Sequence, residues 1–163
     1  MIFSSKAEYG VRLMVELGRQ AGDRPTSLKA IAEAEALPLS YLEHVVADLK
    51  RAGLVQSSRG AHGGYLLSRP ATEIAMDEVV LALEGSVAPM ECLTAVPAPG
   101  RVACSHESDG GRSCSTRLLW VRVQAGVIRA LQGTTLAELV EFSRCGEGDP
   151  LPLATIAEPV RAG

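Results

Sequence analysis

The stretch from residue 39 to residue 68 constrains the fold more than any other part of this chain. Its apolar residues first recur at positions i, i+3, i+4 and i+7, the spacing of one helix face: Leu42, Val45, Val46 and Leu49. Gly53 supplies a stop for that helix. Two short runs, 54–57 and 65–68, then flank the glycine-rich segment 58–64, which is typical of two strands joined by a turn.

A shorter helix is expected just before this one. Thr26 or Ser27 can accept the free N–H groups at its start, and its pattern ends near Pro38. Ser40 then precedes Glu43 by the spacing of a capping box, which predicts where the next helix begins. Two helices joined by a short turn form a helix-turn-helix, and a β-hairpin after them makes the arrangement a winged helix.

Further helices are expected around this unit. One precedes it, at about residues 4–20, and one follows the hairpin at residues 77–84. A long helix starting at Ser115 or Thr116 carries apolar residues at regular spacing, and a capping box at Thr135 predicts a last short helix. The sequence therefore predicts a mostly α fold with a small β-hairpin, namely a winged helix-turn-helix with a long C-terminal helix, for which the family resemblance given below implies a dimerisation role.

Prolines and glycines interrupt the chain between the winged helix and the long helix. We therefore expect a winged helix-turn-helix domain at 1–85, a loop at 86–114, the long and short helices at 115–145, and a flexible tail at 146–163. A loop of this length is uncommon in a compact domain unless it is functional or disordered. The loop is thus the second region in which function is expected.

Charge and hydropathy limit the class of protein. The formal net charge of −3 weakly disfavours a nucleic-acid partner, although a local basic face can belong to an acidic chain. No apolar run approaches the roughly 18 residues that cross a membrane, and the first residues lack the features of a signal peptide. We therefore expect a cytoplasmic protein without a membrane partner.

Three of the four cysteines lie in the loop, at Cys92, Cys104 and Cys114, and Cys145 lies beyond the last helix. Zinc sites usually contain close Cys-x-x-Cys pairs, and this sequence has none. Widely spaced thiolates on a glycine-rich loop are suited to a ligand larger than a single metal ion, such as an iron–sulfur cluster. The spacing alone leaves three interpretations open: metal ligands, redox-active thiols, or structural cysteines buried as small apolar side chains.

Three thiolates leave one iron position for a different ligand. His106 and Glu91 are candidates within the loop, and a carboxylate from the first helix of a partner subunit is a third. Ligands of this kind bind iron less tightly than thiolates and tend to make a cluster labile. Such lability would suit a sensor.

The hairpin tip carries Arg59 and His62. An arginine at such a tip often enters a narrow minor groove, where the potential of DNA is most negative. His62 would either contact DNA beside Arg59 or only shape the turn. Lys50 and Arg51 are expected to interact with the end of their own helix or to contact phosphate rather than to read sequence.

Six segments carry a resemblance to a known family: SSKAEYGVR at 4–12, IAE at 31–33, LSYLE at 39–43, LKRAGLV at 49–55, SRGAHGGY at 58–65 and LEG at 83–85. Over about residues 1–143 the chain resembles the Rrf2 family of bacterial transcription regulators, which includes the IscR, NsrR and RirA types. The resemblance implies a homodimer in which the long helix crosses to the other subunit beside a cluster-binding loop.

The same resemblance implies an iron–sulfur cluster held by Cys92, Cys104 and Cys114. It favours Glu8 of the partner subunit as the fourth ligand over His106. The gaps of eleven and nine residues between the cysteines are wider than is usual in the family. Both a 2Fe–2S and a 4Fe–4S cluster are therefore compatible with the sequence.

The resemblance also implies which residues bind DNA. A recognition helix points its N-terminal residues at base edges in the major groove, and Ser40, Tyr41, Glu43 and His44 lie at that end. The family pattern assigns DNA contact to the first three, and Glu43 could accept from a cytosine amino group. The alternative is that Ser40 and Glu43 only cap the helix. The expected function is a sequence-specific repressor whose affinity for a double-stranded operator is switched by the cluster, which would sense iron or cluster supply, redox state or nitric oxide.

Other functions fit the sequence less well. The main alternative is a regulator of the same fold that senses through thiol chemistry or a small ligand, without a cluster. A helix-turn-helix used only for protein contacts is a further one. An enzyme is not expected, because no histidine has a recognisable catalytic context and no phosphate-binding loop is present.

Overall fold

The computed structural model describes residues 3–20, 24–60, 63–90, 93–94, 114 and 116–145. Within these residues the chain forms helices and a two-stranded hairpin that follow one another in this order: α1 (Ser5–Arg19), α2 (Leu28–Ala34), α3 (Leu39–Arg51), β1 (Val55–Ser58), β2 (Gly64–Leu67), the 3-10 helix η1 (Ala71–Glu73), α4 (Met76–Glu84), α5 (Arg117–Gln132) and α6 (Leu136–Arg144). The predicted mostly α fold with a small hairpin is confirmed.

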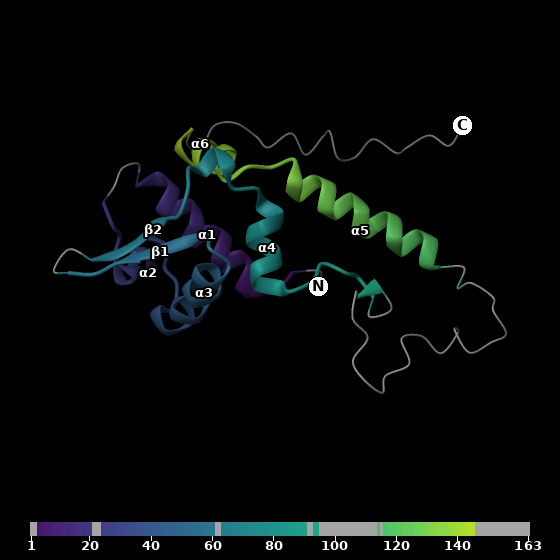
Figure 1. The fold of residues 1–163 in the computed structure, drawn as a ribbon, viewed down its shortest axis with the longest axis horizontal. Helices are drawn as coiled ribbons and strands as arrows, with labels where there is room; N and C mark the ends of the chain where they lie inside the picture. The colour runs from purple at the N-terminus through teal and green to yellow at the C-terminus, as the bar shows by residue number, and fades with distance from the viewer. Residues whose placement is uncertain are drawn as a thin grey trace.

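Helices α1 to α4, α6 and the hairpin pack into one unit, which we call the head (Figure 1). Its core takes the apolar face predicted for α3, because Leu42, Val45, Val46 and Leu49 are all buried. Leu13 of α1 and Leu136 of α6 are completely buried in the same core. The head therefore joins residues from both ends of the described chain.

Local signals in the sequence account for most helix ends. Ser27 caps α2 by accepting a hydrogen bond from the N–H of Ala30. Thr135 and Glu138 form the predicted capping box of α6. Gly53 follows α3 at a φ of 74°, a left-handed conformation that favours glycine. These three predictions are confirmed.

The hairpin, or wing, is pinned to the segment before α2. Strands β1 and β2 pair antiparallel, with Val55 opposite Leu67 and Ser58 opposite Gly64. Tyr65 also exchanges two backbone hydrogen bonds with Thr26, at 2.8 and 3.0 Å. A Cβ atom at Gly64 would lie 2.4 Å from the Thr26 carbonyl oxygen, so this close approach requires glycine. The wing thus has a fixed base.

Helix α5 differs from the five α-helices of the head, each of which buries some of its residues. It leaves the head as a long arm (Figure 1), and none of its residues is buried. Leu118 and Leu119 are 60% and 55% exposed. The following helix, α6, returns to pack against α1 and η1. No described helix is long and apolar enough to cross a membrane.

Candidate nucleic-acid interface

The outward face of α3 carries a second stripe with helical spacing. Ser40, Glu43, His44 and Ala47 are all exposed and occupy positions i, i+3, i+4 and i+7. We call these four residues the outward stripe. Its three polar side chains make no hydrogen bond or ion pair with any other described residue. They are therefore available to an external partner.

The start of α3 differs from the capping box predicted at Ser40 and Glu43. The N-cap residue is Pro38, which has no side chain that can accept a hydrogen bond, and its carbonyl oxygen accepts from the N–H groups of Tyr41 and Leu42. Ser40 already lies inside the first turn, so it cannot cap the helix. The capping prediction is wrong, and no described cap contact holds the side chains of Ser40 and Glu43.

Tyr41 is placed differently from its neighbours. Its half-buried ring meets the ring of Tyr9 on α1 edge to face, with centroids 5.4 Å apart. This contact fixes the N-terminal end of α3 against α1. DNA contact by the Tyr41 ring remains a prediction, while the structure gives the ring a packing role.

The other end of α3 is basic and is tied to its surroundings. The Lys50 ammonium donates to the Ser57 hydroxyl of the wing at 2.7 Å. Asp48 forms ion pairs of 2.6 Å with both Lys6 of α1 and Arg51. The hydrogen bond from Lys6 above all, and then that from Arg51, hold the pKa of Asp48 below its ordinary value. Lys50 and Arg51 thus connect α3 to the wing and to Asp48 rather than interacting with the carbonyl groups at the end of their own helix, and their contact with phosphate stays a prediction.

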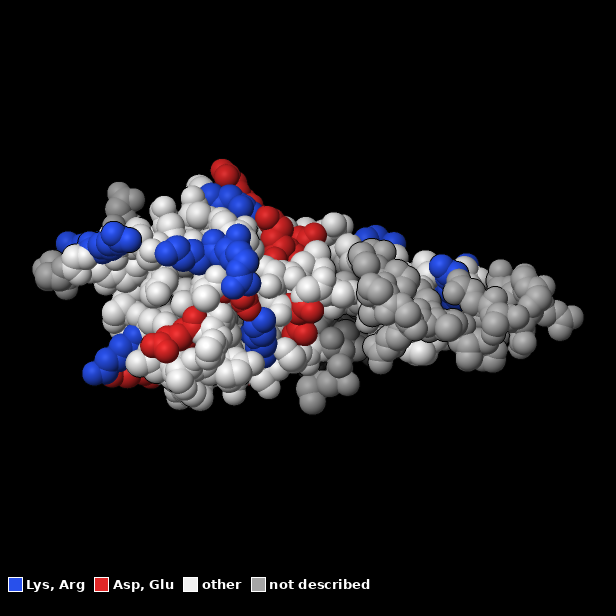
Figure 2. Space-filling view, turned by 60° about the horizontal axis from the view of Figure 1, so that its bottom comes forward, with Lys and Arg blue, Asp and Glu red and all other residues white. Residues whose placement is uncertain are grey.

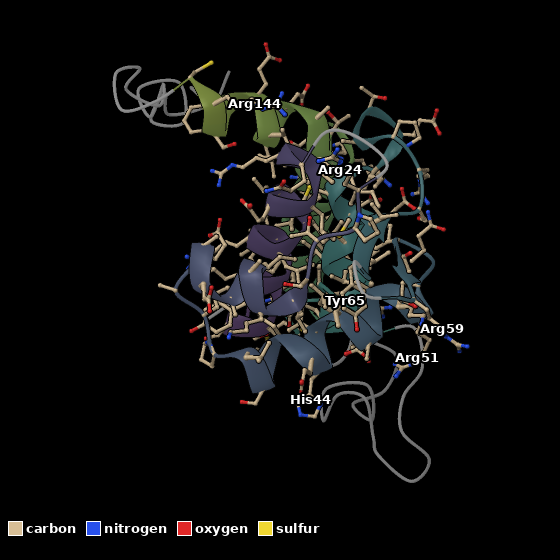
Figure 3. The ribbon with its side chains drawn as sticks, turned by 90° about the vertical axis from the view of Figure 1, so that its left-hand side faces the viewer. Arg24, His44, Arg51, Arg59, Tyr65 and Arg144 are labelled. Carbon is tan, nitrogen blue, oxygen red and sulfur yellow. The ribbon has the colours of Figure 1, made fainter. Side chains whose placement is uncertain are left out.

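The wing and α3 present their basic side chains on one side of the head. Arg59 is exposed just beyond β1 and pairs with no described residue. His44, Arg51 and Arg59 lie along the lower edge of the head in Figure 3, whereas Arg144 lies at the opposite edge. Figure 2 shows Lys and Arg side chains gathered at the wing end. His62 lies outside the described residues.

An arginine of α1 holds the turn between α2 and α3. The Arg12 guanidinium donates to the Glu35 carboxylate at 2.9 Å and to the Glu35 carbonyl oxygen. Ala36, the next residue, has a φ of 52°, which is uncommon for a residue with a side chain. Arg12 thus fixes the angle between the two helices. In the sequence Arg12 was only part of a family motif, because its partner Glu35 is distant along the chain.

Only some of the predicted sensor residues are described. Cys114 is half-buried just before α5, with its sulfur 3.2 Å from the Thr116 hydroxyl. Glu8 is exposed in the first turn of α1, and its carboxylate forms no hydrogen bond or ion pair with any other described residue. The described residues contain no group of three or more metal-binding side chains. Cys92, Cys104 and His106 lie outside them, and Cys145 is exposed at the end of α6.

The end of α4 and the start of α1 are joined directly. The Glu84 carboxylate, at the end of α4, accepts hydrogen bonds from the backbone N–H of Ser4 at 2.9 Å and from its hydroxyl at 2.6 Å. Ser4 in turn caps α1. The residues that lead into the loop are therefore attached to the helix that carries Glu8.

The fold and this face define a winged helix-turn-helix DNA-binding protein. The chain belongs to the Rrf2 family, because the family's sequence model, described as "Iron-dependent Transcriptional regulator", matches residues 3–142. Like its relatives, this chain is a transcriptional regulator and not an enzyme.

Several known proteins resemble most of the chain. The HTH-type transcriptional regulator CymR of Bacillus subtilis is 36% identical over 143 residues, covering 88% of this chain and 92% of CymR. IscR of Yersinia pseudotuberculosis is 36% identical over 140 residues, covering 86% of this chain and 79% of IscR. The structure of T. potens IscR matches with a TM-score of 0.69 and 30% identity, covering 90% of this chain and 92% of that one. That of B. subtilis CymR, titled "the Global Cysteine Regulator", matches with a TM-score of 0.66 and 35% identity, covering 86% and 96%.

Proposed function

We propose that this regulator is a sequence-specific repressor whose affinity for a double-stranded operator is switched by an iron–sulfur cluster. The observation that carries the DNA-binding part is the shared edge of the head on which His44, Arg51 and Arg59 lie. In winged-helix proteins a recognition helix enters the major groove. An arginine at the wing tip is suited to the adjacent minor groove. Ser40, Glu43 and Arg59 are the proposed contacts, with Tyr41 and His62 beside them.

The regulator is proposed to act as a homodimer joined through α5. A helix of this length gains little stability alone, and α5 buries none of its residues against its own head. Leu118, Leu119 and Val121 expose apolar surface that a second copy of the chain would cover. Two copies would present two heads to two half-sites of an operator. Because bacterial operators lie in the cytoplasm, the regulator would act there.

The proposed ligands of the cluster are Cys92, Cys104 and Cys114, with Glu8 of the partner subunit as the fourth. The described members fit this role in their chemistry. Cys114 offers a thiol at the point where the loop meets α5, and Glu8 offers an exposed carboxylate without a described partner. A bound cluster would supply a group that responds to iron supply, oxidants and nitric oxide.

Described contacts connect the end of α4, just before the loop, with α3. Glu84 attaches the last residues before the loop to Ser4 at the start of α1. Two residues further on, Lys6 forms an ion pair with Asp48 of α3. A displacement at the start of the loop would therefore be transmitted through these contacts to α3. Such a connection is a requirement for coupling the cluster site to the DNA-binding helix.

A second candidate is a regulator that senses through thiol chemistry or a small ligand. It is favoured by the similarity to CymR, whose structure is titled as that of a global cysteine regulator. In this version the loop cysteines and Cys145 would act as thiols. The DNA-binding face and the dimer would be unchanged.

Anaerobic purification of the full chain distinguishes the two candidates. A coloured protein with iron and sulfide near stoichiometry, and an operator affinity that changes on exposure to oxygen or nitric oxide, is the expected result. A colourless protein whose affinity responds only to thiol oxidants or cysteine would favour the second candidate.

Replacing Glu8 by Ala should alter the absorbance spectrum and the DNA affinity. If both stay unchanged, Glu8 is not the fourth ligand.

A further inference from the structure

The outward stripe of α3 contains one polar side chain to which no DNA contact has been assigned. His44 lies in the middle of the stripe, between Ser40 on one turn and Ala47 on the next. Its ring is exposed and is neither hydrogen-bonded nor ion-paired to any described residue. An unpartnered imidazole on the groove-facing side of a recognition helix needs an explanation.

The surrounding polar side chains of α3 are occupied by contacts within the head. The ring of Tyr41 packs on that of Tyr9. Asp48 forms ion pairs with Lys6 and Arg51. Lys50 donates a hydrogen bond to the wing. These residues hold the helix in place. Ser40, Glu43 and His44 form no hydrogen bond or ion pair with any described residue. The side chains of α3 that would read bases are therefore different from those that attach the helix to the rest of the head.

The position of His44 suits the major groove. In Figure 3 it projects from α3 at the lower edge of the head, on the side that also carries Arg51 and Arg59. With Arg59 in the minor groove, this side of α3 would face base edges. The neighbouring Glu43 is acceptor-only when ionised, whereas an imidazole ring also offers an N–H donor.

We propose that His44 is a base-reading residue that donates a ring N–H to the N7 edge of a guanine in each half-site. Guanine presents two adjacent acceptors in the major groove, N7 and O6, whereas adenine presents an amino group beside its N7. Glu43, acceptor-only, suits the amino group of a cytosine. Together the two residues would select G·C pairs at neighbouring positions. The inference rests on the proposed sequence-specific DNA binding.

Selection from a pool of duplexes with randomised centres tests the assignment. The full chain, prepared anaerobically, is compared with His44→Ala, His44→Gln and the control Glu141→Ala, an exposed residue of α6 on another part of the head. His44→Ala should lose the preference for guanine at one position per half-site. His44→Gln should shift it to adenine, because a glutamine amide pairs with the N6 and N7 of adenine. The control should enrich the wild-type motif.

A modified base supplies the atomic test. Replacing the selected guanine by 7-deazaguanine removes the N7 acceptor, which should weaken wild-type binding by roughly tenfold. The same replacement should leave His44→Ala binding unchanged, because that variant has no contact to lose. Thermal unfolding confirms that the variants are folded.

Three outcomes would overturn the proposal. An unchanged motif for His44→Ala would show that the imidazole reads no base. A uniform loss of affinity on all sequences, with a salt dependence reduced by about one phosphate contact, would place His44 on the backbone. Equal sensitivity of wild type and His44→Ala to 7-deazaguanine would exclude the N7 contact. If the wild type itself enriched no motif, the proposed sequence-specific binding would fail as well, so the two failures are distinguishable.

Discussion

The head and α5 differ in how they hold their apolar side chains. In the head, Leu13 of α1, Leu42 and Leu49 of α3 and Leu136 of α6 are completely buried in one core. In α5, no residue is buried, and Leu118 and Leu119 are more than half exposed. The head is therefore stabilised by its own residues, whereas in the proposed dimer a second chain would cover the apolar surface of α5. On this proposal, one chain holds a DNA-binding unit and one half of an interface.

The same substitution in the two regions should have very different effects. Leu49→Ala in the core should lower the free energy of unfolding by about 2–5 kcal/mol, because it removes buried methyl groups and leaves a cavity. Leu118→Ala on α5 should lower it by less than about 0.5 kcal/mol at concentrations where the chain is monomeric. Urea denaturation followed by circular dichroism measures both. Equal losses would contradict the comparison.

The base of the wing should tolerate no added side chain. Gly64→Ala would place a methyl group 2.4 Å from the backbone oxygen of Thr26, and a backbone atom cannot move aside cheaply. We expect a loss of about 1–3 kcal/mol, as for an overpacked site. Gly126→Ala on α5, where a Cβ meets no other atom, is the matched control and should not destabilise the protein. A destabilisation as large as that of Gly64→Ala would show that α5 is packed as tightly as the head.

The ion pairs of Asp48 should make a smaller, pH-dependent contribution to the head. The pKa of Asp48 is lowered in the folded protein, so its stabilising effect is complete above the unfolded value of about 3.9 and is lost as the pH falls through the folded value. The stability difference between wild type and Asp48→Asn should therefore shrink on acidification below about pH 4. Glu141→Gln on α6, an exposed carboxylate that forms no ion pair with a described residue, controls for general charge effects. A difference independent of pH would exclude the ion pairs as its cause.

Charged residues on α5 should leave the head nearly unchanged while abolishing association. In the double variant Leu118→Glu and Leu119→Glu, the unfolding of the head at low concentration should change by less than about 0.5 kcal/mol. Analytical ultracentrifugation should show a monomer where the wild type is a dimer. Arg24→Glu changes the net charge by the same two units on the head and should leave the dimer intact. A double variant that still associates would place the interface elsewhere.

The local signals in the sequence located most of the fold. The apolar spacing of Leu42, Val45, Val46 and Leu49 identified the buried face of α3, and Gly53 identified its end. The start of α3 was predicted wrongly, because the helix begins two residues earlier than expected, with Pro38 at the N-cap position and Ser40 already inside the first turn. The spacing of a capping box alone does not reveal that earlier start.

The candidate site was less predictable, because its roles depend on tertiary contacts. The packing of Tyr41 on Tyr9 and the clamp of Arg12 on Glu35 join residues far apart in the sequence. The outward stripe, by contrast, could have been found from spacing, since Ser40, His44 and Ala47 lie opposite the apolar face. The loop ligands were assigned only by family resemblance, and Cys92 and Cys104 lie outside the described residues.

If Ser40, Glu43 and His44 bind DNA as proposed, their independence from the rest of the head has an evolutionary consequence. Because their side chains form no hydrogen bond or ion pair with any described residue, substitutions there should cost little stability. A duplicated copy of the gene could then change these positions and acquire new operators while its core and wing stay intact. The same fold could thus give rise to regulators with different operators, because the intermediate variants would remain folded.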